Sequence, residues 1–129
     1  MSSYWAYLID PGIRNALLRK FHPKFADVIA HHITISLGET KPVGWPDTAL
    51  IQVTGYASDQ SLETLVCTVN GKTLQPRGKR LHITWSLDAT TRKPKESADV
   101  IADGTAIQPV SAGMCFMAKL TLLGRSTTD

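Results

Sequence analysis

The segment "HITISL" (residues 32–37) recurs fifty residues later as "HITWSL" (residues 82–87), with five of its six positions identical. Chance rarely gives a match of this length within 129 residues, so we interpret it as an internal repeat. Successive side chains of a strand point to opposite faces of a sheet. Each copy therefore predicts a strand with one apolar face for a core and one face that carries an imidazole and two hydroxyls.

The rest of the chain predicts one clear helix and several further strands around the two copies. Asp10 is a suitable N-cap and Pro11 a suitable first helical residue, and Pro23 would end this helix. A short second helix is expected after Ser97. Strands are predicted over 4–10, 31–37, 49–57, 62–69, 81–88 and 114–123, with loops at 41–48 and 104–113. This order of elements predicts an α+β fold with a mostly antiparallel sheet.

Bulk properties indicate one small globular domain over residues 1–129. The chain is 43% hydrophobic and carries a formal net charge of +3, which permits an anionic partner without requiring one. No apolar stretch reaches the length of a membrane span, so we expect a cytoplasmic protein. Cys67 and Cys115 lie in apolar segments and are interpreted as buried reduced thiols, with a disulfide or redox pair as the alternative.

The polar face of the repeat suggests acid–base chemistry on a phosphate ester. If the two copies face one cleft, a neutral imidazole can take a proton from a nucleophile while a protonated one gives a proton to the leaving oxygen. Hydroxyls two residues along each strand could donate hydrogen bonds to phosphate oxygens. Such a site needs no metal or other cofactor, and we expect none, because the sequence contains no carboxylate cluster and no Cys/His set with zinc spacing.

The two H-x-T motifs with apolar flanks, in "HHITISLG" (31–38) and "LHITWSLD" (81–88), resemble those of the two-histidine (2H) phosphoesterase superfamily. "DVIAHHITISLG", the run from "VNG" through "HITWSLDATTRKP" and the strand–helix–motif order also resemble a compact bacterial or phage branch related to RNA-repair domains. The resemblance implies a duplicated fold of two intertwined lobes around a central cleft, which we place at about 1–47 and 48–129. It further implies an acid–base pair, His32 and His82, and two phosphate-holding hydroxyls, Thr34 and Thr84.

Members of this superfamily act on 2′,3′-cyclic phosphates, 2′-5′ linkages, ADP-ribose cyclic phosphate or cyclic oligonucleotides. The resemblance therefore implies a metal-independent phosphodiesterase, a monomer, whose substrate is an RNA end or a cyclic nucleotide or oligonucleotide. The alternative is a non-catalytic module that binds RNA or a nucleotide in the same cleft. A third interpretation is a structural repeat whose histidines are satisfied by packing and hydrogen bonds. The sequence leaves open which histidine is the acid.

Further residues are candidates for substrate binding. Tyr4 and Tyr7 could stack on a base, although half-buried packing is the alternative for both. Ser36 and Ser86 share the predicted polar faces of the repeat. Basic residues bracket the second copy and could guide an anion or simply be solvated: Lys72, Arg77, Lys79, Arg80, Arg92, Lys93 and Lys95. Of these, Arg92 and Lys93 are the preferred candidates.

Register also makes predictions about residues next to the motifs. His31 aligns with Leu81, so it should face away from the cleft, among packing residues or at the edge of the strand. Trp85 falls on the apolar face and is predicted to be core. Trp45, in a Gly- and Pro-containing loop, is a candidate to cap a pocket.

Overall fold

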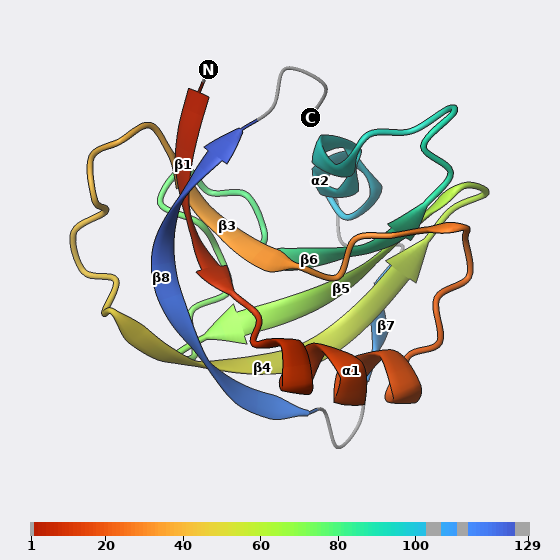
Figure 1. Cartoon of the computed structure of the whole chain (residues 1–129), viewed down its shortest axis with the longest axis horizontal. Helices are drawn as coiled ribbons and strands as arrows, with labels where there is room; N and C mark the ends of the chain where they lie inside the picture. Colours follow the sequence, from red (N-terminus) through yellow and green to blue (C-terminus); the bar gives the residue numbers. More distant parts are fainter. Residues whose placement is uncertain (1, 103–106, 111–113, 126–129) are drawn as a thin grey trace.

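The computed structural model describes residues 2–102, 107–110 and 114–125 of the chain. The fold is mixed α and β, dominated by one antiparallel sheet (Figure 1). Its strands are β1 (Ser2–Leu8), β2 (Asp27–Val28), β3 (His32–Leu37), β4 (Thr48–Ser58), β5 (Leu62–Val69), β6 (His82–Leu87), β7 (Gln108–Pro109) and β8 (Cys115–Arg125). The helices are α1 (Pro11–Lys20), the one-turn η1 (Pro94–Glu96) and α2 (Ser97–Val100).

The strand order is β2-β6-β5-β4-β8-β1-β3, and β7 pairs with β4. β3, which contains the first copy, therefore lies at one end of the sheet, and β6, which contains the second copy, lies near the other. The sheet curls strongly, so that the ends approach and β3 comes beside β6 (Figure 1). Curvature thus brings together two copies that are separated by four strands in the hydrogen-bonding order.

The apolar face of the repeat lies in the core, as the alternation predicts. Ile33 and Ile35 of β3 and Ile83 and Trp85 of β6 are at most 1% exposed and belong to one large apolar cluster. The Trp85 ring N–H donates to the carbonyl of Phe21 (2.8 Å), which satisfies its one polar atom. Burial of these side chains fixes the register of both strands, because a slip of one residue would place them in solvent.

Helix α1 begins as the sequence predicts. The carboxylate of Asp10 accepts hydrogen bonds from the backbone N–H groups of Gly12 and Ile13, and Pro11 follows the cap. Leu17 is fully buried, so this side of the helix is held against the core. The guanidinium of Arg14 donates to the carbonyl of Ala30 (2.9 Å) and thereby ties the helix to the chain just before β3.

Most of the predicted elements are confirmed, with three differences. The structure adds β2 and β7, two-residue strands too short to give a periodic signal in the sequence. The sheet is continuous through both predicted halves, since β8 from the second half lies between β1 and β4. Cys67 is buried as expected, but Cys115 is exposed, and both are free thiols. Among the described residues, no helix is long and apolar enough to cross a membrane.

Candidate active site

A pocket of about 470 Å³ lies where β3 and β6 come together. The pocket is lined by four motif residues: His32, Thr34, His82 and Thr84. These are the residues that the sequence predicts to carry the chemistry, and the fold collects them on one concave surface. Tyr4 also lines the pocket, and its ring centroid lies 5.3 Å from that of His32.

The pocket wall is positively charged. Arg77 and Lys79, from the segment that precedes β6, and Lys95, from η1, line it. No carboxylate among the described residues is part of the lining. Positive charge without nearby carboxylates favours anionic ligands, and phosphate groups above all. The sequence marks these three residues only as members of a larger basic group, because the loops that carry them have no periodic pattern.

His82 is held by its own backbone in a defined tautomer. Its Nδ1 lies 2.9 Å from the carbonyl oxygen of Arg80, which can only accept, so Nδ1 carries a proton and donates it. In the neutral ring Nε2 is then the nitrogen with the free electron pair. Burial lowers the pKa of His82 and Lys79 lowers it further, against the opposing effect of the hydrogen bond to Arg80. The environment therefore favours a neutral imidazole whose Nε2 can accept a proton.

Thr84 is covered by the segment that follows β6. Its hydroxyl lies 3.2 Å from the carbonyl of Pro94 and 2.8 Å from the hydroxyl of Ser97, and Thr84 is only 9% exposed. Because one hydroxyl has one proton, that proton goes to one of these two internal acceptors. Ser97 is fully buried, and no pattern in the sequence indicates its contact with the motif.

Thr34, the equivalent residue of the first copy, has different surroundings. It is partly exposed in the pocket, and its hydroxyl makes no hydrogen bond within the described part of the chain. Its carbonyl accepts from the amide of Gln75 (2.9 Å), which joins β3 to the segment before β6 across the rim of the pocket. Thr34 can therefore offer its hydroxyl proton to a ligand without first breaking an internal bond.

His31 is not where the register predicts. It is exposed, lines the pocket, and places its Nδ1 2.9 Å from the Nδ1 of His32. The prediction that it faces away from the cleft is wrong, because β3 begins only at His32 and strand alternation does not extend back to residue 31. Ala30, directly before it, has a left-handed φ of 44°, which turns the chain at this point.

The serines of the two copies differ in the same way. Ser36 lines the pocket, although its hydroxyl oxygen is covered and has no hydrogen-bond partner within the described residues. Ser86 is fully buried away from the pocket, contrary to the predicted polar face. Its hydroxyl accepts from the backbone N–H of Phe25 (3.1 Å) and donates to the buried carboxylate of Glu63. The chain around β2 covers this end of β6, so Ser86 stabilises the fold rather than meeting a ligand.

Tyr7 also lies outside the pocket. It is fully buried, and its hydroxyl donates to the carbonyl of Pro46 (2.7 Å). Burial raises the pKa of Tyr7 to about 12, and Asp47 acts in the same direction. The packing alternative therefore describes Tyr7, whereas Tyr4 reaches the pocket. Trp45 does not cap the pocket either: it packs in the core, with Lys72 over its ring.

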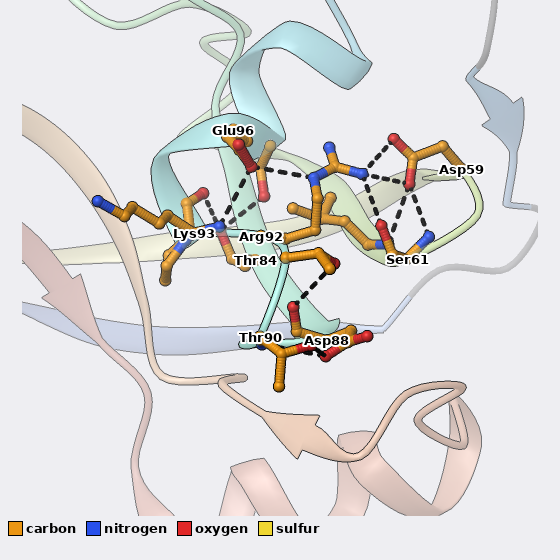
Figure 2. Close-up of polar contacts among 12 residues, drawn as sticks. Asp59, Ser61, Thr84, Asp88, Thr90, Arg92, Lys93 and Glu96 are labelled. Carbon is orange, nitrogen blue, oxygen red and sulfur yellow. Dashed lines mark hydrogen bonds and ion pairs between the residues drawn. The ribbon is translucent and has the colours of Figure 1, made fainter. Parts of the chain in front are cut away.

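Arg92, one of the two preferred basic candidates, is used internally (Figure 2). Its guanidinium donates to both carboxylate oxygens of Asp59 (2.7 Å each) and to Glu96 (2.9 Å). Lys93 is exposed beside it, and neither residue lines the pocket. Figure 2 shows this network joining the turn before β5 to η1, and Lys95 from that same one-turn helix lines the pocket. Arg92 thus supports the pocket wall instead of contacting a ligand there.

Comparisons with other proteins add no family assignment. No protein-family model matches the sequence, and neither the curated proteins nor the solved structures searched give a match. Within the described residues, no group of three His, Cys, Asp or Glu side chains is arranged to hold a metal ion. The site is therefore interpreted from its own residues and from the motif resemblance.

Proposed function

We propose that this chain is a phosphodiesterase of the two-histidine type, acting on an RNA end or on a cyclic nucleotide or oligonucleotide. One observation carries the proposal: His32 and His82 line one pocket with Thr34, Thr84 and three cationic side chains. The repeat alone does not require this juxtaposition, since the two strands are far apart in the pairing order. An anion-binding pocket with two imidazoles suits transfer of protons to and from a bound phosphodiester.

The surroundings of the two histidines support different roles. His82, with Nδ1–H held by the Arg80 carbonyl and a lowered pKa, is suited to act as the base. Its Nε2 would take the proton from water or a ribose hydroxyl as that oxygen attacks phosphorus. His32 would then act as the acid, giving its proton to the leaving oxygen as the phosphorus–oxygen bond breaks. Thr34 would donate to a non-bridging phosphate oxygen, where negative charge accumulates.

The direct test is an assay of 2′,3′-cyclic nucleotides, cyclic oligonucleotides and 2′-5′ oligonucleotides with EDTA present. We expect turnover in EDTA by the wild-type protein, and a loss of at least about 100-fold in kcat for His32→Asn and for His82→Asn. His22→Asn is the matched control, because His22 is exposed and does not line the pocket.

Full activity in either pocket-histidine variant would contradict the mechanism. Tight binding of a nucleotide with no product from any substrate would favour the binding-module alternative. Circular dichroism melting of each variant separates loss of chemistry from loss of fold.

A further inference from the structure

A third histidine touches the proposed acid. The Nδ1 atoms of His31 and His32 are 2.9 Å apart, and the two rings are nearly perpendicular, at 85°. Two ring nitrogens at this distance need one proton between them, since two bare nitrogens or two N–H groups would repel. We propose that His31 is a positioning residue for His32: it shares one proton with the Nδ1 of His32 and so keeps a proton on the Nε2 of His32.

Proton counting supports this role. If His31 donates to a neutral His32, the one proton that belongs to His32 is on Nε2. If the pair carries one positive charge, the shared proton lies between the Nδ1 atoms and each ring also holds a proton on Nε2. In both states the Nε2–H bond of His32 can break as the leaving oxygen takes the proton and keeps the electron pair of its broken bond to phosphorus.

The surrounding charges favour one shared proton over two separate ones. The titratable or charged groups that face the pair across the pocket are Tyr4 of β1, His82 of β6, Arg77 and Lys79 of the segment before β6, and Lys95 of η1. All of these are neutral or cationic, so two fully charged imidazoles would be penalised. A pair that holds a single positive charge, partly on the exposed His31, avoids that penalty and retains an acid.

The backbone holds His31 in place. The carbonyl of His31 accepts from the N–H of Ile9 (3.0 Å), and the N–H of Ala30 donates to the carbonyl of Thr84 (2.9 Å). The chain before His31 is thus tied to β6, the strand of the second copy, while His31 itself is tied to the end of β1. The left-handed conformation of Ala30 persists at a buried alanine because these contacts fix it. The second copy has Leu81 at the equivalent position, so only the first copy can form this pair.

The proton sharing can be measured without any enzyme assay. The chain has four histidines, so long-range ¹H–¹⁵N NMR spectra resolve each ring nitrogen, with His22→Leu used for assignment. In the wild type we expect the His31 and His32 rings to titrate together in two steps. In His31→Leu, which introduces the residue of the second copy, His32 should titrate in a single step at a pH lower by about half a unit or more. An unchanged titration of His32 would overturn the proton sharing.

The catalytic part of this inference rests on the proposed function. In His31→Leu the alkaline limb of the kcat/KM profile should move to lower pH with little change in KM, because the acid loses its proton more easily. His31→Asn, whose side-chain oxygen can accept from the Nδ1 of His32, should restore part of kcat. An unshifted limb in His31→Leu would overturn the positioning role while the enzyme remained active. Absence of turnover by the wild type would overturn the proposed function itself, and the NMR titration would then test the pair alone.

Discussion

The two copies of one six-residue motif have different surroundings. In β3, His32 contacts another histidine and Thr34 keeps its hydroxyl free of internal bonds in the described structure. In β6, the backbone carbonyl of Arg80 holds His82, and Thr84 lies under Pro94 and Ser97. The difference shows that near-identity in sequence does not give identical chemistry. Residues outside the motif decide which imidazole is suited to accept a proton and which hydroxyl is ready to donate one.

Burial explains much of this asymmetry. β6 is an inner strand of the sheet, with β5 on one side and β2 on the other, and every residue after His82 in the strand is buried. β3 is an edge strand whose polar residues remain partly exposed. A histidine packed closely in protein loses stabilisation of its charged form, whereas one beside solvent and a second imidazole keeps it. The site thus combines a buried base with a more accessible acid.

The largest contrast is expected between the two threonines. Thr34→Val should lower kcat about 100-fold with a change in unfolding free energy below about 0.5 kcal/mol, because its hydroxyl is available only to a ligand. Thr84→Val should instead destabilise the protein by about 1–3 kcal/mol, since it leaves a buried partner without its hydrogen bond. Steady-state kinetics and urea unfolding of both variants test this. Equal losses of activity and of stability in the two variants would remove the asymmetry.

A smaller, several-fold effect is expected from the basic residues. Arg77→Gln and Lys95→Gln should each raise KM for a phosphodiester several-fold, and the effect should shrink as salt is added, because both line the pocket as exposed charges. Arg92→Gln should chiefly lower stability, since its guanidinium holds Asp59 and Glu96 together. KM measured at two ionic strengths, beside thermal melts, distinguishes the groups. If Arg92→Gln alone raised KM without loss of stability, the assignment of these roles would be reversed.

The smallest effect concerns stability and pH. Because the pKa of His82 is lowered in the folded state, the unfolded chain binds more protons as pH falls below about 6.5, and stability is lost in that direction. One group contributes at most about 1.4 kcal/mol per pH unit. His82→Asn keeps a donor for the Arg80 carbonyl but does not titrate, so it should lose this part of the slope. Parallel unfolding curves of the two proteins from pH 8 to pH 5 would show that His82 contributes none.

The sequence predicts the apolar half of the repeat better than its polar half. Ile33 and Trp85 are buried as alternation requires, because core packing acts on every residue of a strand alike. The position of Ser86 depends instead on a distant segment, since Phe25 and Glu63 cover it. The pairing of His31 with His32 depends on a single left-handed residue, which no periodic pattern reports. Alternation therefore predicts which face of a strand a side chain occupies but not what covers that face.

The central claim is the division of roles between His82 and His32, and a change of leaving group tests it most directly. A p-nitrophenyl phosphodiester has a leaving oxygen that needs little help from an acid, whereas the leaving oxygen of a 2′,3′-cyclic nucleotide does need a proton. His32→Ala should therefore lose far less activity on the p-nitrophenyl ester than on the cyclic nucleotide, while His82→Ala should lose about the same on both. The reverse pattern, with His82→Ala the variant that the p-nitrophenyl ester rescues, would contradict the assignment of His82 as the base.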